Sequence, residues 1–427
     1  MSSSNSNLVA AMAFAQSSPT DWAYIAEGAL NLVLRYTGTA PELEGYILRV
    51  RKDNPEAAGG KADPDPWAES LRFADKMIVP IIGRRYVQKA HQVPLAPGFM
   101  DELAQVIESS RPEKRRVHPL DTSLQTALLM TDNTSLPGGA GPSVCFELKL
   151  KWGFVPATCP FVTHEVKKRV NRFVMHQQLK FAQGKLDTLS RYSPMDLFSY
   201  EPKRVRAALD ALVATPQNNF RMFVNGVMVY PDDHGHGSQE AFASVVSQCP
   251  NLASSADSLL DSLAAILVSE PLLDRIRTLQ TFDDCDIEGA LPAYQAIVDR
   301  GEAVLPLADG ETLLPREAPT TAPSTPEEQH ETVRRFMLSC TAKDCSTMIV
   351  LKPAPVAVST DNEAPDFRSL PPELEGERVV TAAHGFNYSI AAVDLDPKPL
   401  AKMPKYFKED AKIAEHYAKL EAAGELK

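Results

Sequence analysis

Two separate groups of alternating apolar segments constrain the fold of this chain most. Residues 22–36 alternate and then run apolar around a glycine-containing turn, which predicts a β-hairpin, and residues 46–51 predict a third strand. Helical patterns follow at residues 66–79 and 98–109, and a second strand-rich group opens at residues 144–150. This order predicts an α+β protein with a small N-terminal lobe, built on an antiparallel sheet, and a larger mixed C-terminal lobe.

Changes in composition divide the chain. Residues 1–17 are rich in Ser, Asn and Ala, and we expect them to be disordered. Residues 18–138 would form the N-terminal lobe and residues 139–427 the C-terminal lobe, because a Gly/Pro-rich break separates them. Two Pro-rich segments, residues 314–326 and 352–378, are expected to be surface insertions.

Composition excludes several classes of protein. The chain carries 44 Lys and Arg against 55 Asp and Glu, a formal charge of −11, whereas general nucleic-acid binders present a basic face. No apolar run reaches the about 18 residues that a membrane helix needs, and the first residues lack the pattern of a secretory signal. Six cysteines without a Cys-x-x-Cys pair predict free thiols. We expect an intracellular monomer, in the nucleus, the cytoplasm or both, without a membrane or nucleic-acid partner.

A polar stripe runs along one predicted helix. From Thr163, a candidate N-cap, to residue 182 the apolar residues have helical spacing. On the opposite side Arg172, His176 and Lys180 are four residues apart, so they would point the same way. The helix therefore presents a local basic face in an acidic protein.

The order of several short segments indicates phosphoryl transfer. Kinases with two lobes place a glycine turn over the nucleotide phosphates and a cation on the third strand, which residues 26–31 and Arg49 supply here. Much later, Asp344 precedes a predicted strand, and a second strand at residues 388–393 leads into Asp394. This order would place two carboxylates at one end of a hairpin, one to accept a proton from a hydroxyl and one to hold Mg²⁺.

Seven longer strings make the resemblance specific. They are EGALNLV (27–33), ELKLKWGF (147–154), RFVMHQQLK (172–180), YSPMDLFS (192–199), TPQNNFR (215–221), AKDCS (342–346) and DLDPKPL (394–400). In this order they resemble the signature segments of the inositol-pentakisphosphate 2-kinase family, whose fold is bilobal and protein-kinase-like. The resemblance implies transfer of the γ-phosphate of ATP to the 2-hydroxyl of inositol 1,3,4,5,6-pentakisphosphate, which yields the hexakisphosphate, phytate.

The matching motifs also imply roles for single residues. Gly28 would cover the nucleotide phosphates and Arg49, Glu147 and Lys149 would contact ATP. Asp344 would orient or deprotonate the 2-hydroxyl, and Asp394 would hold Mg²⁺, with Asp396 as a second candidate. The positions that would bind the inositol phosphate are Arg111, Lys151, His176, Lys180, Asn218, Asn219, Lys398, Lys402 and Tyr406.

Such a ligand carries about eight to ten negative charges, so many separate cations and donors are needed to hold it. Some members of the family carry a structural zinc. Here Cys285, His330 and Cys340 lack close metal-ligand spacing, and we expect no zinc.

Other interpretations remain open at this stage. The motifs fit an inositol polyphosphate kinase of another regiospecificity or a broader acceptor range. A non-catalytic inositol-phosphate-binding scaffold is a second alternative, although it would have no need of Asp344 and Asp394 together. The basic run at residues 111–117 could also serve a nuclear or nucleic-acid contact, or form a solvated loop.

Overall fold

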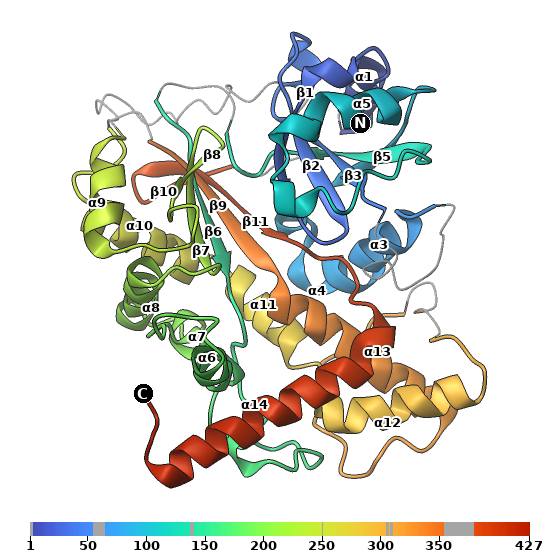
Figure 1. The fold of residues 1–427 in the computed structure, drawn as a ribbon, viewed down its shortest axis with the longest axis vertical. Coiled ribbons are helices and arrows are strands. Elements are labelled where there is room, and N and C mark those ends of the chain that lie inside the picture. Colours follow the sequence, from blue (N-terminus) through green and yellow to red (C-terminus); the bar gives the residue numbers. More distant parts are fainter. Residues whose placement is uncertain are drawn as a thin grey trace, which may run out of the picture.

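The structure, a computed structural model, describes residues 3–53, 65–136, 141–249, 251–304, 307, 311–353 and 380–427. Two groups of strands are seen in Figure 1, one near the N-terminus at the upper right and one in the centre, with most helices around the second group. Both sheets are antiparallel throughout the described residues. The predicted α+β class is therefore confirmed.

The N-terminal sheet contains, within the described residues, five strands in the order β1-β2-β3-β5-β4. They are β1 (Trp22–Glu27), β2 (Asn31–Tyr36), β3 (Tyr46–Arg51), β4 (Ala90–Pro94) and β5 (Thr126–Thr131). In β3, alternate residues such as Leu48 and Val50 are fully buried, which leaves Arg49 on the other face. The predicted hairpin and third strand are confirmed.

Two helices, α1 (Ser3–Phe14) and α5 (Phe99–Ile107), pack beside this sheet. The rings of Trp22 and Phe99 each lie 5.7 Å from the ring of Phe14, which is buried together with Ala10. The expectation that residues 1–17 are disordered is therefore wrong for α1. The second half of α1, residues 8–14, is rich in good helix formers, and two apolar residues one turn apart give that helix a face to bury.

The segment between β3 and β4 belongs by its packing to the C-terminal core. It contains α3 (Ala68–Phe73), a π-helical turn (Ala74–Ile78) and α4 (Val79–Ile82). Met77 and Ile82 are buried in the same cluster as the strands of the second sheet. The parallel bridge between Val87 and Ala392 adds a backbone contact. A boundary between the lobes at residue 138 would therefore assign these helical residues to the N-terminal lobe, although their side chains pack in the C-terminal core.

The C-terminal sheet contains, in the described part of the chain, six strands in the order β10-β11-β9-β6-β7-β8. They are β6 (Val144–Lys149), β7 (Phe220–Val224), β8 (Val227–Tyr230), β9 (Ser346–Pro353), β10 (Thr381–Ala383) and β11 (Phe386–Val393). The pairing of β9 with β11 runs from Phe386 opposite Pro353 to Val393 opposite Ser346. The ends of these two strands that carry the predicted carboxylates therefore lie together.

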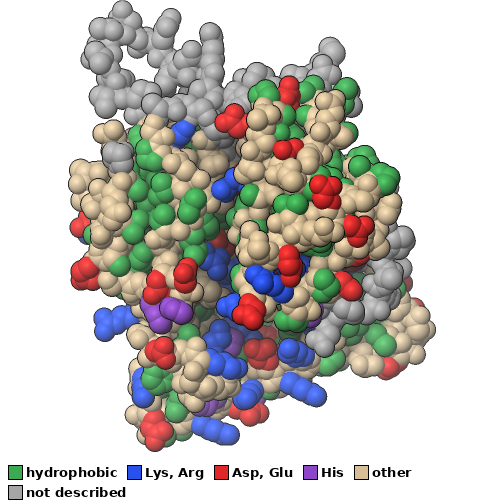
Figure 2. All heavy atoms as spheres, turned by 45° about the horizontal axis from the view of Figure 1, so that its top comes forward, with side chains coloured by type: hydrophobic (Ala, Val, Ile, Leu, Met, Phe, Trp, Pro, Cys, Tyr) green, Lys and Arg blue, Asp and Glu red, His purple; other side chains and the backbone are tan. Residues whose placement is uncertain are grey.

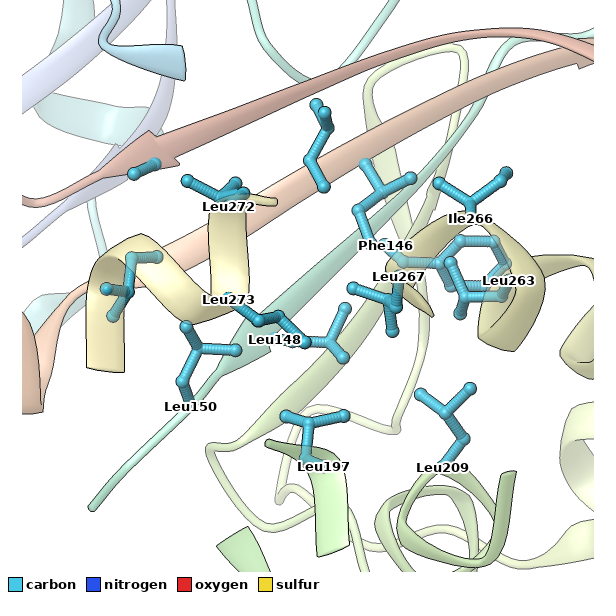
Figure 3. Packing of buried hydrophobic residues seen from close by; sticks show 14 of the residues in the cluster. Phe146, Leu148, Leu150, Leu197, Leu209, Leu263, Ile266, Leu267, Leu272 and Leu273 are labelled. Carbon is cyan, nitrogen blue, oxygen red and sulfur yellow. The ribbon is translucent and has the colours of Figure 1, made fainter. Parts of the chain in front are cut away.

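Helices pack against one face of this sheet. Their bounds are α6 (Arg172–Ala182), α7 (Pro194–Leu197), α8 (Pro202–Ala214), α9 (Gln239–Ser247), α10 (Ala256–Ser269), α11 (Leu272–Gln280), α12 (Asp286–Asp299), α13 (Pro326–Asp344) and α14 (Met403–Ala423). Figure 3 shows Phe146 and Leu148 of β6 close to Leu263 and Leu267 of α10, all of them fully buried. In Figure 1, α14 crosses the lower end of the molecule, where it packs against α6 and α12.

Helix α6 begins eight residues later than predicted. Asn171, not Thr163, is its N-cap, and the Asn171 side chain accepts a 2.9 Å hydrogen bond from the Phe173 N–H. The amide nitrogen of Asn171 also donates to the Trp152 carbonyl at 2.7 Å, which fixes the start of α6 beside the end of β6. Thr163 instead donates its N–H and hydroxyl to Glu288. The expectation of a helix from residue 163 is therefore wrong for its first turns.

The Pro-rich segment at residues 314–326 is held against the C-terminal unit. Arg316 forms a 2.6 Å ion pair with Asp284, and Thr325 caps α13 in a capping box with Glu328. Residues 352 and 353 belong to β9, whereas the rest of the predicted insertion at 352–378 lies outside the described residues. None of the helices in the described part of the chain is both long and apolar enough to cross a membrane.

Candidate active site

A cavity of about 440 Å³ lies where β6 ends, and helices α6, α12, α13 and α14 contribute to its walls. Figure 2 shows Lys and Arg side chains in the middle and lower part of one face, with Asp and Glu among them. We call the cavity the cup. Eight residues of the predicted site line it: Lys151, His176, Lys180, Asn218, Asn219, Asp344, Lys398 and Tyr406. The fold thus brings together segments that are more than 250 residues apart in the sequence.

The wall formed by α6 carries His176 and Lys180, one helical turn apart. Burial, together with the charges of Lys180 and Arg172, lowers the pKa of His176 to about 3. Burial also lowers the pKa of Lys180. In the free protein near neutral pH, His176 is therefore a neutral hydrogen-bonding group and not a cation.

Lys151 follows the end of β6 and has a left-handed backbone with φ +60°. Burial lowers its pKa to about 8, although the nearby Asp344 charge acts in the opposite direction. A non-glycine residue in this conformation costs about 1 kcal/mol or more, and such residues gather at functional sites. Asp394, at the end of β11, has a similar φ of +61°. Lys151 and Asp394 thus both have an unusual backbone conformation, and Lys151 lines the cup whereas Asp394 does not.

The turn before β7 supplies the two asparagines. The side chain of Asn219 is almost fully buried, and its Oδ1 has no hydrogen-bond partner among the described residues. An unpaired buried amide oxygen costs about 1–3 kcal/mol. Its place on the cup wall therefore fits a ligand or a water molecule that supplies a hydrogen-bond donor.

Two carboxylates lie at the shared end of β9 and β11. Asp344 is the last residue of α13, with Cys345 between it and β9, and Asp394 directly follows β11. Lys398 Nζ lies 2.6 Å from Asp344 Oδ2, and Lys149 Nζ lies 3.6 Å from Asp394 Oδ2. Burial raises the pKa of Asp344, but the charge and hydrogen bond of Lys398 outweigh it, so that the net shift is downward. Asp344 is therefore ionised at neutral pH.

Asp394 and Asp396 differ in their contacts. The side chain of Asp394 is 61% exposed, whereas Asp396 is ion-paired with Arg49 of β3 and its carbonyl accepts from Thr341. Mg²⁺ is usually held by one or two carboxylates together with substrate phosphates. The exposed carboxylate of Asp394 fits that pattern, and the pair Arg49–Asp396 joins the N-terminal sheet to the segment after β11.

The described residues contain no cluster of three or more His, Cys, Asp or Glu that could hold a metal ion without a substrate. Cys285 and His330 are buried, His330 lies 3.2 Å from Glu302, and Cys340 lines the cup. All six cysteines are free, as predicted. The expected absence of zinc remains a prediction for metal analysis.

The residues predicted to contact ATP lie on both sheets. Gly28 is in the turn between β1 and β2, and no atom lies within 4 Å of the position a Cβ would take there. Glu147, on β6, accepts hydrogen bonds from Arg221 at 2.8 Å and from Ser346 at 3.0 Å. Lys149 lies on the same strand and pairs with Asp394. Glu147 and Lys149 share one side of β6, because they are two residues apart.

Two predicted substrate residues do not line the cup. Arg111 is buried in the N-terminal unit, where its guanidinium forms bonds of 3.0 and 3.1 Å to Glu27, which also accepts from Lys52 at 2.8 Å. A buried carboxylate next to Gly28 requires cationic partners, and Arg111 fills that need. Lys402, in the short turn before α14, is half-buried outside the cup lining.

Sequence reasoning did not identify a network of buried charges in and behind the wall of the cup. Lys167 lies 2.7 Å from Asp286 and 2.6 Å from Asp410, and Asp410 also accepts from Arg172 at 2.8 Å. Lys343 pairs with Asp283 at 2.5 Å and lies 3.9 Å above the ring centre of Trp152. The spacing of Arg172, His176 and Lys180 on one face of α6 could have placed Arg172 at the site. The partners of Lys167 come from α12 and α14, which no local pattern connects.

Comparisons with known proteins agree with this site. The family model described as inositol-pentakisphosphate 2-kinase matches residues 24–412. An inositol-pentakisphosphate 2-kinase of Oryza sativa subsp. indica is 31% identical over 93% of this chain and 94% of its own length. Proteins of the same name from Arabidopsis thaliana and Danio rerio are 30% and 27% identical, over 95% and 93% of this chain and 94% and 93% of their own lengths. The chain belongs to the inositol-pentakisphosphate 2-kinase family.

Proposed function

We propose that this protein transfers the γ-phosphate of ATP to the 2-hydroxyl of inositol 1,3,4,5,6-pentakisphosphate and so forms the hexakisphosphate. Membership of the family supports the reaction class, since the relatives carry the name of that activity. The observation that carries the proposal is the cup, where Lys151, Lys180 and Lys398 meet the carboxylate of Asp344. Phosphorylation of a polyanionic alcohol requires cations that bind its phosphates and a carboxylate that acts on its free hydroxyl.

The nucleotide would lie between the two sheets, in a bilobal, protein-kinase-like arrangement. In this reading the turn at Gly28 covers the phosphates, while Arg49, Glu147 and Lys149 contact ATP. The Arg49–Asp396 pair supports it, because it joins the N-terminal sheet to the segment after β11. Mg²⁺ would be held by Asp394, with Asp396 as the second candidate, and when bound it would neutralise charge on the transferred phosphate.

Asp344 would act on the acceptor hydroxyl. Its lowered pKa makes it a weak base, so its main contribution is to orient the hydroxyl and to accept the proton late in the transfer. The ion pair with Lys398 holds the carboxylate in place at the cup wall. Lys398 can at the same time face a phosphate, because an ammonium group has three donors.

The rest of the cup would hold the substrate phosphates. Lys151 and Lys180 supply charge, His176 and the two asparagines supply neutral hydrogen bonds, and Tyr406 supplies a phenol group. Lys402 remains a candidate at the rim. Arg111 would have to leave its buried partner Glu27 before it could contact a ligand, and we therefore assign it to the support of the glycine turn.

Product analysis tests the proposal. The purified protein is incubated with ATP, Mg²⁺ and the pentakisphosphate, and the inositol phosphates are separated and assigned by phosphorus NMR. We expect one product, phosphorylated at the 2-position. A product with another new position would favour a kinase of different regiospecificity, and tight binding without turnover would favour a non-catalytic scaffold.

A further inference from the structure

One acidic side chain in the cup differs from the others. Five carboxylates line the cavity, and four of them have a Lys or Arg within ion-pair distance. Glu409 of α14 is the fifth. Among the described residues, its one neighbour within that distance is His176, with 3.7 Å between Nε2 and Oε1. Because the pKa of His176 is lowered to about 3, this contact does not neutralise Glu409 at neutral pH.

The lining of the cup carries as many carboxylates as cationic side chains, and Lys167, which is not part of the lining, pairs with two of those carboxylates. Five cationic side chains line the cavity against the five carboxylates: Lys151, Arg172, Lys180, Lys343 and Lys398. Three of these cations are already paired within the wall, with Asp410, Asp283 and Asp344. A polyanion that enters this cavity therefore meets less positive charge than the number of lysines suggests. Glu409 is the carboxylate whose removal would add positive charge without breaking an ion pair.

Glu409 is also well placed to act on a ligand. Its side chain is 43% exposed, whereas the carboxylates of Asp283, Asp286 and Asp410 are nearly buried. Its charge opposes the burial effect that lowers the pKa of Lys180, which places Glu409 near that ammonium group. A phosphate held by His176 and Lys180 would therefore lie close to a negative charge that, among the described residues, has no Lys or Arg within ion-pair distance.

We propose that Glu409 limits the affinity of the cup for inositol polyphosphates and so favours release of the product. This inference rests on the proposed function of the cup as the inositol-phosphate site. A carboxylate about 6 Å from a doubly charged phosphate in a wet cavity weakens binding about fivefold to tenfold. The effect applies to the pentakisphosphate and the hexakisphosphate alike, and it is larger for the ligand with more charge near Glu409.

The test compares Glu409→Gln with Glu415→Gln, an exposed carboxylate on the same helix that does not line the cup. Isothermal titration of each variant and of the unmodified protein with the pentakisphosphate and the hexakisphosphate, without ATP, measures affinity independently of turnover. Inhibition of the kinase reaction by added hexakisphosphate is the second measurement. Both are repeated at about 0.05 M and 0.5 M salt, which changes the screening of exposed charges.

We expect Glu409→Gln to bind both ligands about fivefold to tenfold more tightly at low salt, with product inhibition at a correspondingly lower concentration. The gain should shrink at high salt, and the apparent KM for ATP should not change. Unchanged or weaker binding by Glu409→Gln, or an equal gain in Glu415→Gln, would overturn the inference. If the unmodified protein neither binds nor phosphorylates the pentakisphosphate, the proposed function itself fails, and the inference with it.

Discussion

Lys398 Nζ lies 2.6 Å from Asp344 Oδ2, and this ion pair joins the segment after β11 to the end of α13 at the wall of the cup. Burial alone would raise the pKa of Asp344 and lower the pKa of Lys398. Their interaction reverses both shifts, so that the pKa of Asp344 is lowered and the pKa of Lys398 is raised. Both groups are therefore charged at neutral pH. The carboxylate that would act on the hydroxyl is thus ionised and fixed before a substrate arrives.

Loss of Lys180 should weaken substrate binding far more than ATP binding. The variant Lys180→Ala removes one ammonium from the cup, and a hydrogen bond to a charged group is worth about 2 kcal/mol, or about thirtyfold in affinity. The KM for the pentakisphosphate should rise by about that factor, while the KM for ATP should stay the same. Lys203→Ala, on the exposed side of α8, is the matched control. Equal effects on both KM values would contradict the placement of Lys180.

Substrate affinity should fall as the pH rises through about 8. Lys151 has its pKa lowered to about 8 in the free protein, so it loses its charge above that pH, while substrate phosphates favour the charged form. Measured from pH 7 to 9.5, the KM for the pentakisphosphate should therefore increase with pH. Lys151→Arg should flatten this dependence, because arginine stays protonated. A pH profile that is the same in both proteins would show that Lys151 is not the group responsible.

The two carboxylates after β11 should differ in their effect on turnover. Asp394→Asn removes the more exposed carboxylate, and we expect turnover to fall at least about a hundredfold and not to recover when Mg²⁺ is raised. Asp396→Asn breaks the pair with Arg49 and should mainly raise the KM for ATP. Steady-state kinetics over a range of Mg²⁺ and ATP concentrations distinguish a loss of turnover from a raised KM for ATP. Near-normal turnover in Asp394→Asn together with its loss in Asp396→Asn would reverse the assignment.

Arg111 should matter for stability more than for substrate recognition. Its side chain is 1% exposed and is bound to Glu27, so Arg111→Gln leaves a buried carboxylate with Lys52 alone. Removing one partner of a buried ion pair costs about 3–5 kcal/mol. The free energy of unfolding, from urea titration, should fall by about that amount. A stable Arg111→Gln protein with a strongly raised KM for the pentakisphosphate would restore the substrate role that sequence reasoning assigned.

The fold was largely readable from local patterns. The strands of the hairpin and the third strand each have a hydrophobic period that one short segment carries by itself. The start of α6 was misplaced because Thr163 and Asn171 are both good N-caps, and the choice depends on the carbonyl of Trp152, which lies far away in the sequence. Helix α1 was missed because its polar composition obscured two apolar residues that bury against Trp22 and Phe99.

The site was predicted where family motifs supplied the residues, and the cup does gather eight of them. The position of Arg111 could not be read from its motif, because its burial depends on Glu27, a residue 84 positions away. The ion pairs in the wall of the cup, and the position of Glu409 away from any Lys or Arg within ion-pair distance in the described residues, depend on which side chains from α6, α12 and α14 meet in space. The spacing of residues in the sequence does not predict which side chains of different helices come into contact.

The most direct test of the central claim is a comparison of Asp344→Asn with the unmodified protein. In single-turnover experiments with ATP, Mg²⁺ and the pentakisphosphate, the rate of phosphoryl transfer should fall about a hundredfold to ten-thousandfold. Titration calorimetry should show that the variant still binds both ATP and the pentakisphosphate. Transfer at a rate within a few-fold of the unmodified protein would contradict the account, because Asp344 would then not act on the acceptor hydroxyl.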